Sequence, residues 1–488
     1  MDQNTRLILL RYLIYHFEGR CNKDLFSEYI QILEMIVGPE DAKRLKLTTY
    51  ASDPAIKDLF KGMLHKIQNT RSADDLVTEV RDFIVIADKL IDYAYDNDDY
   101  EAYLLAMVVK SDYSWVFVEK LLDENYYLLK ANPAIKSISS PQQSYQHYIT
   151  TTVKLKEGDE CIWLAESKGR IFTLSLWGKN FVIRHVKEWE KYKMDEWLDK
   201  GFDSLSFDET INRNGQIEQY LESDQLEDEL RVKKELQFAS LEKTESKSII
   251  IVKDMDLSKF PHNLILDNNG NFISSYKPMV CVPSIEWFIE SGQADVFLGK
   301  PYTTSLWIPT DSGDYALNLL WSRLSNAISG FNINIQTTIA PSASLNSDVN
   351  ILISHGSRDI STSHNISPGE GTTLVGTDLL ISRGSILILF ICHSGSMTKA
   401  LFRDKVMSLI RQYFQAGCQA IVAPLWSLHV SVPPIWLPAF INSIENNDTV
   451  AEAVHKANME VYSINKNPGA WACLHLYGNP YIKIHSHN

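Results

Sequence analysis

Residues 387–396 read LILFICHSGS. Five apolar residues, from Leu387 to Ile391, run directly into Cys392, and small polar residues with Gly395 follow. A short, unbroken apolar run bounded by turn formers is typical of a strand buried on both faces of a parallel sheet. In α/β proteins the carboxyl ends of such strands carry the reactive groups. The stretch therefore raises the question of whether Cys392 packs in a core or attacks a substrate.

The carboxyl-terminal half of the chain alternates between strand and helix patterns. Strand-like runs occur at 248–252, 296–301, 349–354, 386–392 and 420–426, and helical patterns fit 313–329, 397–416 and 435–458. Upstream, residues 160–183 read as two strands around the turn at Lys168-Gly169. This alternation predicts an α/β fold with a mostly parallel sheet sandwiched by helices.

Residues 1–135 show helical periodicity instead. Apolar side chains between Leu76 and Ile91 recur at spacings of three and four, as in an amphipathic helix. The segment shows no convincing 34-residue repeat. We predict an all-α amino-terminal module, which is either a plain helical bundle or a regulatory module that docks an activating protein partner. The stretch KSISSPQQS (136–144) reads as a linker.

Composition and charge narrow the class of protein. The chain has 488 residues, of which 45% are hydrophobic and 22% charged, a balance typical of a globular protein with more than one domain. Its net charge of −14 argues against direct binding to nucleic acid or to an anionic membrane. The apolar runs are too short for a membrane span, and the amino end lacks a signal-peptide pattern.

The cysteines indicate thiol chemistry rather than cross-links. Six are scattered along the chain without a CxxC pair: Cys21, Cys161, Cys281, Cys392, Cys418 and Cys473. Their spacing fits neither a zinc site nor a disulfide framework, so we expect no metal and no cofactor. We expect a reducing, cytoplasmic compartment.

A histidine ends the strand-like run that precedes Cys392. Residues 349–354 lead into His355-Gly356, and Cys392 follows His355 by 37 residues, about one crossover between parallel strands. If the two strands are neighbours, imidazole and thiol emerge at the same sheet edge, where they can exchange a proton. The amides of Gly356 and Cys392 could then bind the oxyanion of an acyl-transfer reaction.

The reactive interpretation of Cys392 competes with a simpler one. A helix pattern begins directly after Cys392, and the dipole of such a helix would favour a thiolate. A cysteine at the end of a buried strand is, however, more often a small hydrophobic residue of the core. The spacing of His355 and Cys392 alone leaves both interpretations open.

Further motifs, taken in order, resemble the CHAT domain family of caspase-like cysteine peptidases, in the clan of caspases, separase and gingipains. The resemblance covers roughly residues 150–485. Its motifs are FPHNL (260–264), Pro283-Ser284, ISHG (353–356), FICHSGS (390–396), Leu425-Trp426, Phe440 and AWACLHLYGNP (470–480). The resemblance implies a caspase-like protease domain at 136–485. Within it, about 150–310 would be a pseudo-caspase half with a charged insertion at 186–246, and about 311–485 the catalytic half.

By the same resemblance, His355 and Cys392 form the catalytic dyad, with oxyanion amides from Gly356 and Cys392. The candidates for the substrate pocket are Asp359, Asp378, Trp426, Ser427 and His429. Many family members carry an acid three positions after the Leu-Trp pair, where this chain has His429. A preference for a basic residue before the cut is therefore left open. His393 is expected to point away from the nucleophile.

The resemblance also implies a biological setting. It implies an endopeptidase that cleaves a specific protein substrate and stays latent until a partner binds at 1–135 or a segment within 357–380 matures. Some family members serve prokaryotic defence or signalling, including CRISPR-associated and gasdermin-type immunity, and the resemblance implies such a role here.

Two other functions compete with this one. A catalytically silent scaffold with the caspase-like fold would bind partners without turnover, and both His429 and the helical module favour it. An α/β-hydrolase esterase is disfavoured because the chain has no GxSxG motif.

Overall fold

The computed structural model describes residues 57, 60–61, 86–108, 110–111, 144–178, 180–190, 192–198, 222–254, 257–299, 301–341, 345–356, 365–369, 372–375, 386–395, 409–415 and 417–484. The chain divides into two compact units, one of residues 1–109 and 124–148 and one of residues 110–123 and 149–488. In the first unit, residues 86–97 and 100–108 are helical. Asp99 begins the second of these helices by accepting a hydrogen bond from the Ala102 N–H at 3.0 Å. The predicted boundary at residue 135 stays a prediction.

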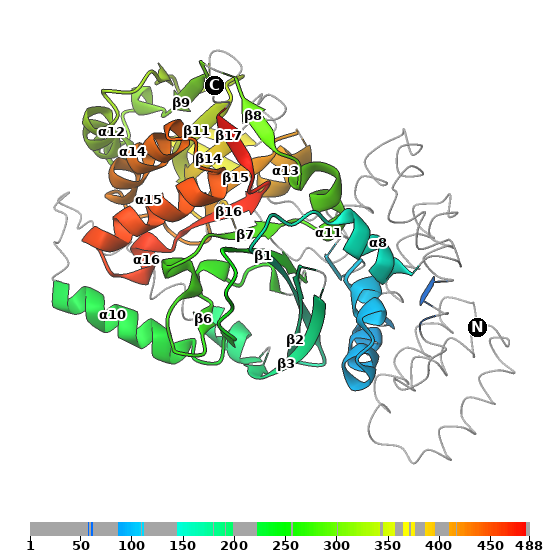
Figure 1. Cartoon of the computed structure of the whole chain (residues 1–488). Coiled ribbons are helices and arrows are strands. Elements are labelled where there is room, and N and C mark those ends of the chain that lie inside the picture. The colour runs from blue at the N-terminus through cyan, green and yellow to red at the C-terminus, as the bar shows by residue number, and fades with distance from the viewer. Residues whose placement is uncertain are drawn as a thin grey trace, which may run out of the picture. The chain divides into compact units, whose positions relative to one another are not determined.

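A large sheet forms the centre of the second unit (Figure 1). Its strand order is β10-β9-β11-β14-β15-β16-β7-β5-β1-β2-β3. Neighbours are parallel from β10 to β15 and from β16 to β1, whereas β15–β16, β1–β2 and β2–β3 are antiparallel. The predicted α/β fold with a mostly parallel sheet is confirmed. The strands are β1 (Asp159–Ser167), β2 (Arg170–Trp177), β3 (Asn180–Glu190), β5 (Ser248–Lys253), β7 (Met279–Val282), β9 (Thr304–Trp307), β10 (Asn334–Gln336), β11 (Val349–Gly356), β14 (Ile386–Ile391), β15 (Ala420–Pro424) and β16 (Leu474–Gly478).

Six strands of the described part lie outside this row. β12 (Asn365–Gly369) and β13 (Thr372–Val375) form an antiparallel hairpin on the end of β11. The strand predicted at 296–301 is β8 (Val296–Leu298), but it pairs with β17 (Ile482–Ile484) in a separate two-stranded sheet. A second small sheet joins β4 (Ser240–Leu241) to β6 (Leu266–Asp267).

Helices cover the sheet and connect its strands. They are α10 (Glu222–Glu235), α11 (Ile285–Trp287), α12 (Tyr315–Ala327), α13 (Leu409–Gln415), α14 (Val432–Glu445), α15 (Val450–Ile464) and α16 (Pro468–Trp471), and α8 (Tyr145–Thr152) precedes β1 along the chain. The single helix predicted at 435–458 is wrong, because α14 and α15 occupy this range as two helices. The chain turns at Asn447 (φ 66°), and Thr449 and Glu452 form a capping box that begins α15. Of the helix predicted at 397–416, residues 409–415 form α13, and residues 397–408 and 416 lie outside the described part.

The two faces of β14 pack against different helices, because alternate side chains of a strand point to opposite faces. Leu387 and Leu389 belong to a buried cluster with Tyr413 of α13. On the other face, the ring of Phe390 meets that of Trp436 of α14, with centroids 5.8 Å apart. All six residues of β14 are buried. This double burial explains the unbroken apolar run in the sequence.

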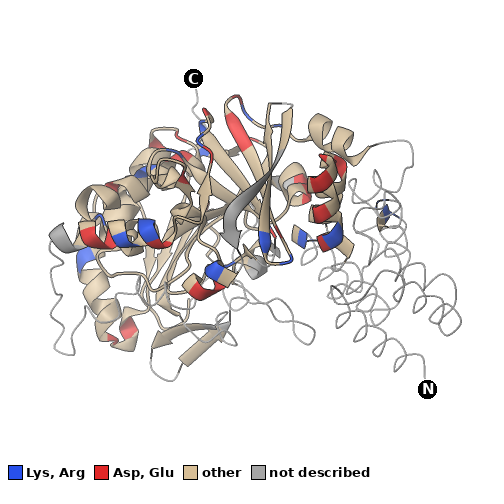
Figure 2. Ribbon diagram, turned by 90° about the horizontal axis from the view of Figure 1, so that it is seen from below, with Lys and Arg blue, Asp and Glu red and all other residues tan. Residues whose placement is uncertain are grey.

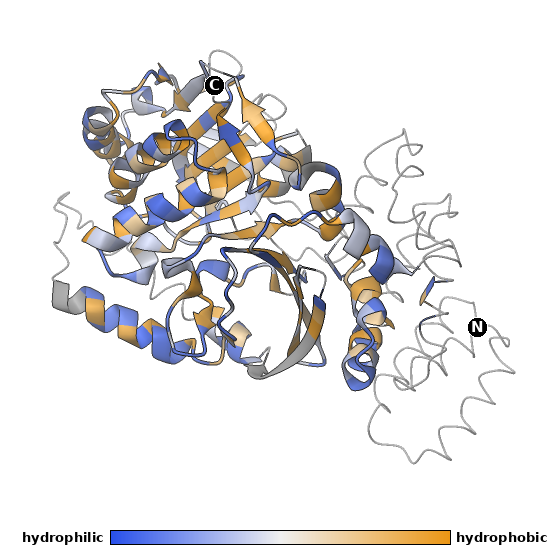
Figure 3. Cartoon of the chain, viewed as in Figure 1, coloured by the Kyte–Doolittle hydropathy of each residue, from blue (hydrophilic) through white to orange (hydrophobic). Residues whose placement is uncertain are grey.

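Charge and hydropathy follow these layers. Lys, Arg, Asp and Glu lie mostly on helices and loops (Figure 2), and the strands of the sheet are mostly apolar (Figure 3). In the described ranges, every helix is too short or too polar to cross a membrane.

Candidate active site

The strands that end in His355 and Cys392 are neighbours in the sheet. β11 and β14 run parallel, and their register pairs Ser354 with Ile391. The next residues, His355 and Cys392, therefore emerge side by side at the carboxyl edge of the sheet. The two strand ends also approach each other closely at Gly356, where an added Cβ would lie 1.9 Å from the Cys392 carbonyl oxygen. Only glycine lets the two backbones approach this closely.

Cys392 differs from the other cysteines in its exposure. It is partly exposed, whereas the four others in the described part of the chain are buried: Cys161, Cys281, Cys418 and Cys473. Burial raises the pKa of the Cys161, Cys281 and Cys473 thiols, as expected for core residues. Exposure therefore separates Cys392 from these core thiols.

A tight turn follows Cys392 and is fixed to the end of β15. His393 has a left-handed backbone (φ 60°), and its N–H donates to the Trp426 carbonyl at 3.3 Å. The Gly395 N–H donates to the Pro424 carbonyl at 2.8 Å. From the same segment, the Leu428 N–H points at the Cys392 sulfur, 3.4 Å away.

His355 lies between two supporting structures. On one side the β12–β13 hairpin pairs Ser367 with His355, and the Ser354 hydroxyl donates to the Ser367 carbonyl at 2.8 Å. On the other side, the Asp314 Oδ1 atom lies 3.0 Å from His355 Nε2. The hairpin occupies part of the segment 357–380 that was predicted to mature.

Asp314 did not emerge from the sequence as a site residue. It is the N-cap of α12, where its side chain accepts a hydrogen bond from the Leu317 N–H at 3.0 Å. The available signal was its place at the start of the helix predicted at 313–329. That signal indicates a cap and does not indicate a histidine partner.

The predicted pocket residues lie in different environments. Trp426 is fully buried, and its indole N–H donates to the Gly469 carbonyl at 2.9 Å, so it packs in the core. Ser427 is buried, with its hydroxyl 3.3 Å from Nε2 of His393. Asp359 and Asp378 lie outside the described residues.

His429 is half-buried and lies close to Ser431. Its Nδ1 atom is 2.5 Å from the Ser431 hydroxyl. Burial, with a smaller effect of Arg323, lowers the pKa of His429 to about 4. The side chain is therefore neutral near pH 7, so position 429 carries neither the acid of the family pattern nor a positive charge.

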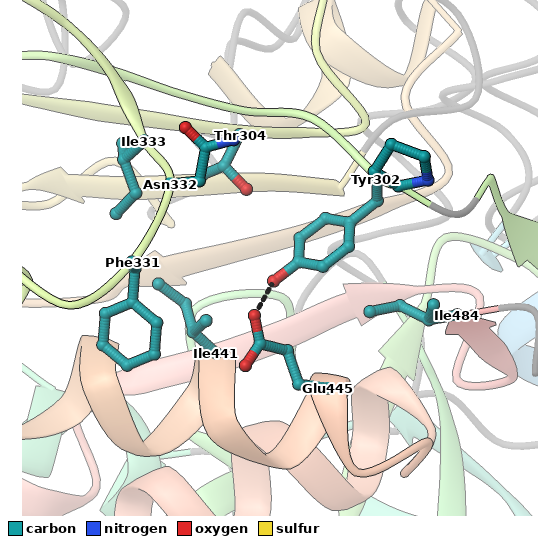
Figure 4. Close-up of a pocket in the computed structure, with 9 residues that line it drawn as sticks. Tyr302, Thr304, Phe331, Asn332, Ile333, Ile441, Glu445 and Ile484 are labelled. Atoms are coloured by element: carbon teal, nitrogen blue, oxygen red, sulfur yellow. Dashed lines mark hydrogen bonds between the residues drawn. The ribbon is translucent and has the colours of Figure 1, made fainter.

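A cavity of about 400 Å³ lies away from His355 and Cys392 (Figure 4). It is lined partly by Tyr302 and Glu445, whose side chains share a hydrogen bond of 3.0 Å. Thr304, another lining residue, begins β9, and pairs with Val349 at the start of β11. The cavity therefore lies at the amino ends of the strands, opposite His355. In the described part of the chain, no group of three or more His, Cys, Asp or Glu side chains could hold a metal ion.

Comparisons with known proteins identify the class of fold. Two crystal structures of the Saccharomyces cerevisiae separase–securin complex, at 2.6 and 3.0 angstrom resolution, are similar, with TM-scores of 0.53 and 0.51 and sequence identities of 10% and 11%. The match covers 98% of this chain in both cases, but 45% and 43% of the separase chain. The chain thus has the caspase-like fold of separase and spans less than half of that protein's length.

Sequence comparisons add little to this result. No protein-family model matches the chain. Tetratricopeptide repeat protein 28 of Mus musculus is 25% identical over 131 residues, which are 26% of this chain and 5% of that protein. At 10–11% identity, the likeness to separase establishes the fold alone.

Proposed function

We propose that this protein is a cysteine endopeptidase of the CHAT type, with Cys392 as nucleophile and His355 as general acid and base. The observation that carries the proposal is the placement of a partly exposed thiol beside a histidine on adjacent parallel strands. The caspase-like fold supports it, because separase belongs to the same clan of cysteine proteases.

The residues of the site suffice for peptide hydrolysis. The Cys392 thiol transfers its proton to His355, and the thiolate forms a bond to the carbonyl carbon of the substrate. The amides of Gly356 and Cys392 bind the oxyanion that results. His355 then protonates the amine as the C–N bond breaks, which leaves a thioester on Cys392. Water, deprotonated by His355, attacks the thioester and releases the acid, while the thiol regains a proton.

Labelling and cleavage with site variants test this proposal. We expect an electrophilic peptide probe to label wild type but not Cys392→Ala, and we expect His355→Ala to abolish cleavage, because the thiol proton then has no acceptor. Cys418→Ala removes a buried thiol and serves as the matched control, which should label like wild type. Equal labelling of wild type and Cys392→Ala would reject the proposal, provided that both proteins show the same circular dichroism spectrum.

A catalytically silent scaffold is the alternative, and the neutral His429 at the position of the family's acid favours it. A scaffold should capture its partner equally well in wild type and Cys392→Ala, and neither protein should cleave it. Cleavage of a captured protein by wild type alone excludes this alternative.

The regulatory setting belongs to the same proposal. We propose that the chain is a latent cytoplasmic enzyme of a prokaryotic defence or signalling system, and that a protein binding at residues 1–135 or maturation within 357–380 activates it. The separase of the comparison was crystallised with securin, a second protein. Mixing the full chain with proteins encoded beside it, and measuring probe labelling of Cys392, tests this step. Labelling of the isolated chain that is as fast as in the presence of each of these proteins would contradict latency.

A further inference from the structure

The proposed reaction needs an imidazole held in one orientation, and a carboxylate lies against the imidazole of His355. The two atoms in contact are Asp314 Oδ1 and His355 Nε2, 3.0 Å apart. Nε2 is shielded from solvent and makes no hydrogen bond of good geometry to the described residues. The two atoms therefore lie within pairing distance, and the ring must rotate before an Nε2–H group can donate to the carboxylate.

The sheet topology explains how Asp314 reaches this place. β11 lies between β9 and β14, and all three strands are parallel. Asp314 belongs to the connection from β9 to α12, His355 ends β11, and Cys392 follows β14. Three successive strands thus deliver a carboxylate, an imidazole and a thiol to the same edge of the sheet, with the imidazole in the middle.

Local hydrogen bonds hold Asp314 in position. Its Oδ1 atom accepts the Leu317 N–H at 3.0 Å, and its carbonyl accepts the Asn318 side-chain amide at 2.9 Å. Its own N–H donates to the Ser312 hydroxyl at 3.3 Å. Gly313 precedes it with φ 77°, a left-handed turn that favours glycine. The carboxylate is therefore fixed by the start of α12 and does not depend on His355 for its position.

The charge of Asp314 suits a partner of imidazolium. Burial raises the pKa of Asp314, but the Leu317 N–H and the neighbouring His355 outweigh this effect, and the pKa lies below its ordinary value. The group is ionised at neutral pH. An ionised carboxylate can accept a hydrogen bond from a ring N–H group.

We propose that Asp314 is the positioning residue of the site, which makes the constellation a Cys–His–Asp triad. This inference rests on the proposed peptidase activity. Asp314 fixes the ring of His355 through Nε2 and leaves Nδ1 to take the proton of Cys392 and to give it to the leaving amine. It also stabilises the imidazolium that exists between these two transfers.

Asp314→Asn separates this role from that of a helix cap. Asparagine is as good an N-cap as aspartate, so α12 should keep its cap while the carboxylate charge is lost. We expect kcat for peptide amides to fall about 10²-fold, within the range that general acid–base catalysis contributes, with KM within about twofold of wild type and an unchanged melting temperature. Asp314→Glu, which restores a carboxylate, should recover part of kcat.

Thr449→Ala is the matched control for a lost cap. Thr449 caps α15 through the Glu452 N–H, at a place that the mechanism does not use. This variant should lower the melting temperature and leave kcat unchanged. If loss of a cap accounted for the effect at Asp314, Asp314→Asn would behave like wild type and Asp314→Ala would behave like Thr449→Ala.

The leaving group gives a second readout. A library of fluorogenic peptide amides first identifies the sequence that is cleaved best. The amide and the thioester of that peptide then serve as the two substrates. A thiolate leaving group needs no proton from His355, so Asp314→Asn should slow the amide far more than the thioester. Equal slowing of both substrates, or wild-type kcat in Asp314→Asn, would overturn the inference while leaving the peptidase proposal intact. Absence of amide cleavage by wild type, once Cys392 labels with the probe, would instead overturn both.

Discussion

The backbone of Gly356 lies against the carbonyl group of Cys392, and a methyl group at position 356 has no room. The Cβ of Gly356→Ala would meet the Cys392 carbonyl oxygen, a backbone atom that cannot rotate away. We expect this variant to lose about 1–3 kcal/mol in the free energy of unfolding, measured in urea, and to lose probe labelling because Cys392 must shift.

Gly330→Ala is the control for this change. An added Cβ at Gly330 has no atom within 4 Å, so only the ordinary difference between the two residue types remains. The two alanine variants should differ clearly in both stability and labelling. Equal behaviour would mean that β11 and β14 do not pack at their ends as described.

The residues of the candidate site differ in how far the sequence reveals them. His355 and Cys392 each follow an apolar run, and parallel strands bring such ends to one edge, so their meeting could be predicted. Asp314 could not, because it follows β9, a strand of only four residues whose place beside β11 depends on pairing between distant segments. Trp426 is in the core because its indole N–H has a buried carbonyl as partner, a contact that no local pattern encodes.

Among the elements, α14 carries one side chain, Trp436, that contacts both the sheet and α15. Trp436 stacks on Phe440, with centroids 5.0 Å apart, and meets Phe390 of β14 edge-on. Its indole N–H donates to the Asn458 side-chain oxygen of α15 at 2.7 Å. A single residue therefore connects three elements.

Trp436→Phe tests this connection. The change keeps an aromatic ring but leaves the Asn458 oxygen without this donor and creates a small void, so we expect a loss of about 1–3 kcal/mol in the free energy of unfolding. Ile464→Ala, at an exposed position near the end of α15, should change stability by less than about 0.5 kcal/mol. Denaturation in urea measures both. Equal stability of the two variants would show that Trp436 does not couple these elements.

Helices and strands could be predicted where the sequence shows a single clear hydrophobic pattern. β5, β11, β14 and β15 agree with their predicted ranges to within about two residues, because strands buried on both faces are continuously apolar. The prediction of one helix at 435–458 failed because α14 and α15 are both apolar on one side. Their separation depends on the turn at Asn447 and the cap at Thr449. β8 could be recognised as a strand, but its sheet could not.

At the scale of the whole molecule, the buried carboxyl group of Glu286 makes the free energy of unfolding depend on pH. Burial raises the pKa of Glu286 from 4.5 to about 8. The folded chain therefore holds a proton that the unfolded chain releases above pH 4.5. This contribution to stability is complete below that pH and is lost as the pH rises through about 8.

Thermal unfolding between pH 5 and pH 9 measures this effect. Wild type should lose stability toward pH 9, and Glu286→Gln, which stays neutral, should lose less. Glu290→Gln, four residues away at an exposed position, serves as the comparison, because Glu286 is buried and Glu290 is not. Parallel curves for wild type and Glu286→Gln would contradict a protonated Glu286.

β16 has a consequence for how the molecule assembles. It is the strand between β15 and β7, and its residue Leu474 also accepts a hydrogen bond from Asn263, 211 residues earlier in the chain. Contacts between such distant segments form late, since a long stretch of chain must be ordered first. Until β16 pairs with β15 and β7, the backbone N–H and C=O groups on the facing edges of these two strands are unpaired and can bind the strands of other chains. Substitutions that weaken the pairing of β16 with β15 or β7 should therefore reduce the yield of refolding, through aggregation, before they affect the folded protein.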